Sequence, residues 1–229
     1  MSDRLSIKRN TICDGLYAAL LSNAFDRAMA LDGKVSEKVL DLEGMSGRNY
    51  RLFINNLISS LPDPRYLEVG CWAGSTACSA MDGNRVTMLC IDNWTQFNGP
   101  KEAFFANVIA TRTSLVNFYF LEADFRQVNY NTVGKYNCYL FDGPHAREDQ
   151  YDGLMLALPA LDDEFVFIVD DWNWEPVRDG TMQAIAAAGL KIKTSIDVRT
   201  TQHNAHPEFA GKHSDWHNGY FLSVLRKSH

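Results

Sequence analysis

The fold of this chain is decided by the stretch from Arg65 to Thr76, which reads RYLEVGCWAGST. A short apolar run ends in an acid, a glycine turn follows, and a pair of hydroxyl residues opens the next segment. This order predicts a parallel strand that passes into a helix around a nucleotide-like ligand. We expect Gly70 and Gly74 to let the backbone approach that ligand, because a Cβ there would collide with it. Ser75 or Thr76 is expected to cap the helix.

Downstream of this turn, apolar strand patterns alternate with helical patterns. The predicted strands of this region are Tyr66–Val69, Val86–Asp92, Asn117–Glu122, Asn137–Asp142 and Phe165–Asp170. The predicted helices are Ser75–Met81, Lys101–Thr111, Arg147–Leu158 and Val177–Ala187. The third crossover, from Asp124 to Val133, is short and polar and is expected to hold at most one helical turn. Such alternation implies right-handed crossovers and a doubly wound, parallel α/β sheet.

The two ends of the chain depart from this alternation. Leu190–Val198 and Tyr220–Leu225 have strand patterns, with a polar loop and no good helix between them. Two such strands should pair antiparallel as a hairpin. Residues 11–60 have mostly helical spacing. The sequence therefore predicts a mostly parallel, seven-stranded, Rossmann-like sheet in residues 65–229, with an antiparallel C-terminal hairpin and an N-terminal helical extension over residues 1–64.

Composition limits the classes of function. The 229 residues carry a net charge of −6, which disfavours broad nucleic-acid binding through phosphates. The five cysteines are an odd number without C-x-x-C spacing, and most lie in apolar runs, which favours reduced thiols in a cytoplasm. Residues 1–10 lack the apolar core of a signal peptide, and no segment approaches the roughly 20 apolar residues that span a bilayer.

Acidic residues follow all five strands of the alternating region. They are Glu68, Asp92, Asp124, Asp142 and the pair Asp170-Asp171. Aspartate is common at such turns for structural reasons alone, but acids at one rim of a sheet favour a functional site, because ligands bind outside the carboxyl ends of the strands. Asp92 lies where an acid accepts hydrogen bonds from a ribose diol. Asp124 is placed to contact an adenine amine, with Phe125 near the ring.

Asp142, Asp170 and Asp171 form a separate group, because they end two neighbouring strands. Carboxylates that converge repel one another unless a cation or protons neutralise them, and oxygen ligands favour Mg²⁺, or else Mn²⁺ or Ca²⁺. Asn173 is a candidate for a further oxygen ligand. The structural alternative makes Asp171 a helix cap and Asp170 an ion-pair partner. His145 follows Asp142 closely and is a candidate general base, although it could equally pack at the start of a helix.

Four histidines gather in the polar loop before the last strand: His203, His206, His213 and His217. No cysteine or acid completes a zinc signature around them. We interpret this loop as a mobile lid in preference to a metal site.

These motifs resemble the class I S-adenosylmethionine-dependent methyltransferases over nearly all of residues 65–229. The pattern from Glu68 through Gly70 to Gly74 looks like the first motif of that family. DGPH at 142–145 and VDDW at 169–172 resemble the fourth- and fifth-strand motifs of the macrocin O-methyltransferase-like (type 24) branch, in which acids at these positions hold Mg²⁺.

The resemblance implies transfer of a methyl group from S-adenosylmethionine to an oxygen of a small-molecule acceptor. It implies cofactor contacts by ten residues: Glu68, Gly70, Gly74, Ser75, Asp92, Asn93, Trp94, Asp124, Phe125 and Asp142. Asp142 or His145 would take the acceptor's proton, and Asp142, Asp170 and Asp171 would hold Mg²⁺. The segment from Gly44 to Arg48 is expected to close over the cofactor, and homo-oligomerisation stays open.

Two alternatives compete with this interpretation. A nicotinamide-dependent oxidoreductase would need a tighter G-x-G-x-x-G turn than the G-x-x-x-G found here. A non-catalytic module that binds S-adenosylmethionine would keep the fold without turnover, although the set of three carboxylates argues against it.

Overall fold

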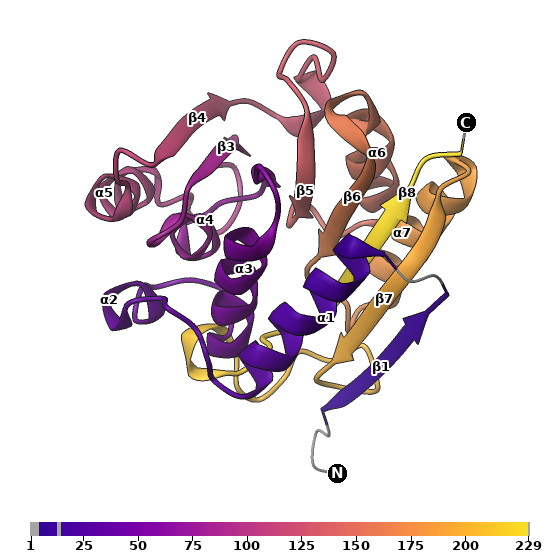
Figure 1. Cartoon of the computed structure of the whole chain (residues 1–229), viewed down its shortest axis with the longest axis horizontal. Helices are drawn as coiled ribbons and strands as arrows, with labels where there is room; N and C mark the ends of the chain where they lie inside the picture. Colours follow the sequence, from indigo (N-terminus) through magenta and orange to yellow (C-terminus); the bar gives the residue numbers. More distant parts are fainter. Residues whose placement is uncertain (1–4, 13–14, 229) are drawn as a thin grey trace.

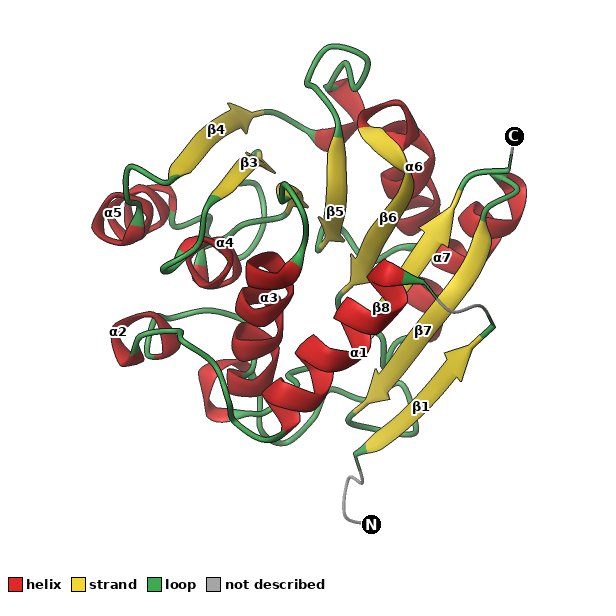
Figure 2. Cartoon of the chain, in the orientation of Figure 1, coloured by secondary structure: helices red, strands yellow, loops and turns green. Residues whose placement is uncertain are grey.

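The computed structural model describes residues 5–12 and 15–228, so Cys13 lies outside the described residues. Strands and helices alternate along the chain (Figures 1 and 2). The strands are β1 (Ser6–Thr11), β2 (Arg65–Val69), β3 (Val86–Asp92), β4 (Val116–Glu122), β5 (Tyr136–Phe141), β6 (Leu161–Val169), β7 (Lys191–Arg199) and β8 (Tyr220–Arg226). The α-helices are α1 (Leu16–Met29), α2 (Glu37–Leu40), α3 (Arg48–Ser60), α4 (Ser75–Met81), α5 (Lys101–Thr111), α6 (Arg147–Ala157) and α7 (Glu175–Ala187). Within the described residues there are also three 3₁₀ turns: η1 (Phe125–Gln127), η2 (Leu158–Ala160) and η3 (Gly211–His213).

The strands form a single mixed sheet in the order β1-β7-β8-β6-β5-β2-β3-β4. Strands β2 to β6 pair in parallel, and β8 pairs antiparallel with both β6 and β7. The predicted doubly wound sheet and C-terminal hairpin are therefore confirmed. The third crossover holds only the single turn η1, also as predicted.

The predicted count of seven strands is wrong, because the sheet has eight. The additional strand is β1, which pairs antiparallel with β7 from Ser6↔Arg199 to Thr11↔Thr194. Its sequence, SIKRNT, is polar because β1 is an edge strand whose side chains are mostly exposed, so it lacks the apolar signal used to find the others. The N-terminal extension is thus helical only after this strand.

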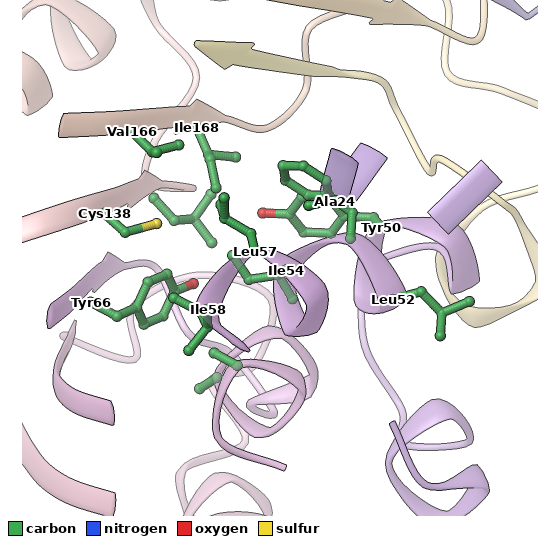
Figure 3. Packing of buried hydrophobic residues seen from close by; sticks show 14 of the residues in the cluster. Ala24, Tyr50, Leu52, Ile54, Leu57, Ile58, Tyr66, Cys138, Val166 and Ile168 are labelled. Carbon is green, nitrogen blue, oxygen red and sulfur yellow. The ribbon is translucent and has the colours of Figure 1, made fainter. Parts of the chain in front are cut away.

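Two apolar cores lie on opposite faces of the sheet. Helices α1, α3, α4 and α5 contribute to one core, and α6 and α7 to the other. In Figure 3, Leu57 and Ile58 of α3 lie with Cys138 of β5 and with Val166 and Ile168 of β6. Residues that alternate along β5 and β6 face alternate cores, which explains why residues 138–141 and 165–169 are apolar throughout.

Helix α3 is fixed at its amino end by a segment that is distant in sequence. The backbone N–H of Arg48 donates to the carbonyl oxygen of Ser214 at 2.7 Å, and that of Asn49 to Asp215 at 3.0 Å. These carbonyls satisfy donors that have no partner within the helix. The buried Arg51 guanidinium donates to the carbonyls of Leu40 and Leu42 at 2.8 and 2.7 Å. The N-terminal helices and the segment before β8 are therefore held together by these hydrogen bonds.

Candidate active site

A cavity of about 420 Å³ opens at the carboxyl ends of β2, β3, β5 and β6. Most of the site residues predicted from the sequence line it: Gly70, Asp92, Asn93, Trp94, Asp124, Phe125, Asp142, His145, Asp170 and Asp171. Glu68, Gly74 and Ser75 are buried nearby but are not among the lining residues. The acids after successive strands therefore meet at one rim, as the sequence predicts.

The glycines of the β2–α4 turn are required by packing within the protein. Gly70 has φ +84°, and a Cβ there would overlap the carbonyl oxygen of Asp142. Gly74 has φ +83°, and a Cβ there would lie 2.9 Å from the ring of Phe104. Left-handed backbone of this kind favours glycine. Contact with the neighbouring strand's turn and with α5 thus requires these glycines, and the close approach of a ligand stays a prediction.

Helix α4 is not capped by a hydroxyl, so that prediction is wrong. Gly74 occupies the N-cap position, and Ser75 is the first residue of the helix. The Ser75 hydroxyl instead pairs with the hydroxyl of Ser46 at 2.8 Å. This contact joins the glycine turn to the N-terminal segment at residues 44–48, whose Met45 lines the cavity.

Glu68 is fully buried in β2, beneath the turn. The Tyr66 hydroxyl donates to its Oε2 at 2.7 Å, while Oε1 has no hydrogen-bond partner in the described part of the chain. Burial raises the pKa of this carboxyl to about 8. Glu68 therefore keeps its proton at neutral pH in the absence of a ligand.

Asp92 fixes the loops around one end of the cavity. Its Oδ2 accepts hydrogen bonds from the backbone N–H groups of Cys71 and Trp72 at 2.7 and 3.1 Å. Its Oδ1 accepts from the N–H of Trp94 at 2.8 Å. A carboxylate has about four acceptor sites, so Asp92 can still accept a bond from a ligand hydroxyl.

Aromatic side chains and a short turn complete this end. Trp94 stacks on Phe120 with ring centroids 5.5 Å apart. Asp124 accepts from the backbone N–H of Arg126 at 2.9 Å and so begins η1, which places Phe125 against the cavity. Trp72 and Trp174 also line the cavity, whereas Trp172 packs on Phe221 inside the protein.

The opposite end of the cavity holds a cluster of acids. Oxygen or nitrogen atoms of Asp142, His145 and Asp171 lie within 4.8 Å of one another, and His145 Nε2 is 2.5 Å from Asp171 Oδ2. The carboxyl groups of Asp142 and Asp170 hydrogen-bond to each other, and Asp170 Oδ1 accepts from the backbone N–H of Asp171 at 2.7 Å. The predicted set of Asp142, Asp170 and Asp171 does converge, and His145 joins it.

Burial and neighbouring groups shift the pKa values of the three aspartates in this cluster. Burial, followed by the charge of Asp170, raises the pKa of Asp142 well above its usual range. Burial likewise raises the pKa of Asp170. Burial also acts to raise the pKa of Asp171, but the hydrogen bond and charge of His145 outweigh it and lower that pKa. The cluster therefore retains at least one proton, since Asp142 and Asp170 cannot both ionise easily.

Asn173 is not placed as a ligand to this cluster. Its Oδ1 accepts from the backbone N–H groups of Thr200 and Thr201 at 2.9 and 3.2 Å, and its Nδ2 donates to Asn218 Oδ1 at 2.8 Å. Asn218 in turn donates to Asp171 Oδ1 at 2.6 Å. The sequence analysis missed Asn218, because it precedes β8 and no motif near it points to the acids.

The histidine-rich loop contributes two of its four histidines to the cavity. His206 and His217 line it, whereas His203 and His213 do not. The backbone N–H of Gly211 donates to His217 Nδ1 at 2.8 Å. Burial lowers the pKa of His217 to about 4, so its ring is neutral at pH 7 and carries its proton on Nε2. The loop forms a wall of the cavity, and its movement as a lid stays a prediction.

Comparisons with known proteins agree with this geometry. Residues 67–172 match a family model described as a methyltransferase domain (type 24). No curated protein matches the chain in sequence. Within the residues that the structure describes, no helix combines the length and apolarity needed to cross a bilayer.

Three solved structures illustrate the structural similarity. TrmN from Thermus thermophilus has a TM-score of 0.54 at 15% identity, covering 89% of this chain and 52% of its own, so this chain spans about half its length. The O-methyltransferase TomG from Streptomyces achromogenes, in complex with SAM, has a TM-score of 0.50 at 15% identity, covering 91% and 90%. The O-methyltransferase from Bacillus cereus, in complex with SAH, has a TM-score of 0.52 at 13% identity, covering 94% and 93%.

These likenesses show a shared α/β fold. Residues 67–172 are therefore similar to a methyltransferase domain of the type 24 kind, within a fold that the methyltransferase structures share.

Proposed function

We propose that this protein transfers a methyl group from S-adenosylmethionine to a hydroxyl oxygen of a small molecule, with help from a divalent cation. The observation that carries this proposal is the meeting of Asp142, His145 and Asp171 at one end of the cavity, within 4.8 Å of one another. TomG, described as an O-methyltransferase involved in tomaymycin synthesis, supports oxygen as the acceptor atom.

The opposite end of the cavity would hold the cofactor. Asp92 and Asp124 offer carboxylate oxygens to the ribose and the adenine amine, and Asn93, Trp94 and Phe125 border the adenosine. Gly70 brings the β2 turn to the cavity wall, and Asp142 adjoins it. Glu68, Gly74 and Ser75 would stabilise the conformation of this turn without lining the cavity. S-adenosylmethionine supplies an electrophilic methyl group on a sulfonium, so the protein's main task is to position donor and acceptor.

The acid cluster fits a hard divalent cation such as Mg²⁺. Its donors are carboxylate oxygens, and a bound cation would offset the burial and the neighbouring carboxylates that raise the pKa values of Asp142 and Asp170. We propose Asp142 and Asp171 as ligands, with Asp170 as a third ligand or as the support of both. When bound, such a cation lowers the pKa of an acceptor hydroxyl.

The proton of the acceptor hydroxyl needs a receiving group. His145 and Asp142 both line the cavity beside the cluster and are the candidate general bases. Asp171 orients His145 through the 2.5 Å contact to Nε2. A base held in this way can accept a proton without reorganisation.

The remaining features support a small acceptor in a reducing compartment. The cavity rim is acidic, which disfavours the phosphates of a nucleic acid. Cys71, Cys78, Cys90 and Cys138 are buried free thiols, in line with a cytoplasmic location.

Isothermal titration tests the proposal directly. We expect S-adenosylmethionine to bind and NAD not to bind, and we expect a methylated product by mass spectrometry when a panel of hydroxylated metabolites is supplied with Mg²⁺. Binding of NAD without binding of S-adenosylmethionine would refute the proposal. Binding of S-adenosylmethionine without turnover of any acceptor would favour a non-catalytic module.

A further inference from the structure

The end of the cavity that holds the acids is enclosed by a continuous series of aromatic rings. The ring centroid of His145 lies 5.0 Å from that of Trp174 in an edge-to-face arrangement. Trp174 lies 6.0 Å from His206, and His206 lies 5.5 Å from His217. All four side chains line the cavity. Successive rings are tilted by 59° to 83°, so they form a curved wall around the acids.

The lining of the cavity offers no cationic partner to an acceptor. Five of the lining residues are aspartates, and among the lining residues that the structure describes none is lysine or arginine. The nearby arginines on adjoining elements already have protein partners. Arg178 donates to the carbonyls of Trp172 and Asn173, and Arg126 pairs with Asp149 and Asp152 at 2.7 and 2.9 Å.

His217 adds a directional polar group to this wall. Gly211 occupies its Nδ1, so Nε2 carries the only ring proton and serves as a fixed hydrogen-bond donor. A donor of this kind suits an acceptor oxygen, and it offers no charge to a carboxylate or phosphate group.

We propose that the acceptor is a planar hydroxylated compound without an anionic substituent, bound with its ring against Trp174 and His206 and with an oxygen hydrogen-bonded to His217 Nε2. This inference rests on the proposed function, because it takes the acids as the place where the reacting hydroxyl lies. An anionic substituent away from the reacting hydroxyl would lose its water shell and face the aspartates without gaining a cationic side chain. A planar ring suits the wall because offset and edge-to-face contacts between rings are favourable.

The test uses three probes that share a pair of neighbouring ring hydroxyls and differ in charge. Methylcatechol is neutral, protocatechuate carries a carboxylate, and dopamine carries an ammonium group. Each is titrated into the full-length protein in the presence of Mg²⁺ and S-adenosylhomocysteine. We expect methylcatechol to bind, protocatechuate to bind at least about tenfold more weakly, and dopamine to bind at least as tightly as methylcatechol because the aspartates attract its ammonium group.

Variants locate the binding site. Trp174→Leu should weaken methylcatechol binding about tenfold, and Trp174→Phe, which keeps a ring, should restore most of the affinity. His217→Phe keeps the ring but removes the N–H, and should weaken binding by about two- to tenfold. His203→Ala is the matched control, because this exposed residue belongs to the same loop but does not line the cavity. Thermal melting of each variant checks that it is folded.

The outcomes separate the two proposals. Failure of S-adenosylhomocysteine to bind would refute the proposed function. If it binds, three results would overturn the acceptor inference alone: protocatechuate binding as tightly as methylcatechol or dopamine, no binding of methylcatechol, or equal effects of Trp174→Leu and His203→Ala.

Discussion

The two ends of the cavity differ in the sequence separation of the residues that form them. At the end proposed to hold adenosine, called the adenosine end below, Asp92 and Asp124 each lie at or just past the end of a strand and accept hydrogen bonds from backbone N–H groups of turns. At the acid end, Asp171 depends on Asn218, which lies 47 positions further along the chain. The first end is assembled from local strand-turn units, and the second needs segments that meet only in the folded protein.

This difference predicts that substitutions at the two ends have separable effects. Variants at the adenosine end should weaken cofactor binding. Variants at the acid end should impair turnover while the cofactor still binds. The following predictions run from the largest expected effect to the smallest.

Asp171→Asn should lower turnover by about 10²- to 10⁴-fold, because it removes the charge that orients His145 and contributes to the proposed cation site. Asparagine tolerates the positive φ of +55° at this position and still accepts from Asn218. Steady-state kinetics and calorimetry are the measurements, with Asp179→Asn on the exposed surface of α7 as the control. A large loss of cofactor affinity would show that the two ends are not separable.

Gly70→Ala should lower the free energy of unfolding by roughly 2–5 kcal/mol, because it combines a strained backbone with an overlap against the Asp142 carbonyl. Gly189→Ala is a matched control with φ +63° and no atom within 4 Å of the new Cβ, so it should cost only about 1–2 kcal/mol of backbone strain. Urea denaturation measures both. Equal losses of the free energy of unfolding in the two variants would mean that contact between the turns that follow β2 and β5 contributes nothing to stability.

Asp92→Ala should weaken S-adenosylmethionine binding by about 10- to 100-fold, because three backbone donors lose a charged acceptor along with any ligand hydroxyl. Asp92→Asn, which keeps one acceptor oxygen, should have a smaller effect. Calorimetric titration gives the affinities. An unchanged dissociation constant for the alanine variant would remove Asp92 from the cofactor site.

Glu68→Gln should change how stability depends on pH. The folded-state pKa of Glu68 is raised to about 8 from 4.5, so the folded protein holds a proton that the unfolded chain has lost between these values. The free energy of unfolding of the wild type therefore falls as pH rises from about 4.5 to 8. Glutamine cannot titrate, so the variant should gain on the order of 3–4 kcal/mol relative to wild type between pH 5 and pH 8.

Urea denaturation at pH 5, 6.5 and 8 follows this effect, and the exposed substitution Glu102→Gln on α5 controls for loss of a charge elsewhere. Parallel pH profiles for wild type and Glu68→Gln would mean that Glu68 is ionised in both states.

Much of the fold could be predicted because its signals are local. The helices Ser75–Met81 and Lys101–Thr111 form with the predicted bounds, and the predicted strands form with ends shifted by at most four residues. Apolar runs between glycine and acid turns carry this information. Strand β1 was missed because its pairing with β7, and not its own apolar character, makes it a strand.

The parts of the candidate site that could be predicted are likewise those with local sequence signals. Asp92, Asp142 and Asp171 could be placed at one rim because each follows a parallel strand. The prediction of Asn173 as an oxygen ligand was wrong, because its partners Thr200 and Asn218 come from segments that local patterns do not connect to it. His206 and His217 could be noticed in the sequence, but only the folded loop distinguishes them from His203 and His213.

The position of β8 has a consequence for how the molecule is made. This strand follows β7 in the chain, yet it lies between β6 and β7 in the sheet. Until β8 has left the ribosome, β7 and β1 have no connection to the parallel strands, although those strands are already synthesised. During synthesis the edge of β6 therefore stays unpaired until β8 is available. The residues around Asn218 complete the acid end of the cavity only in this same late step, because they directly precede β8.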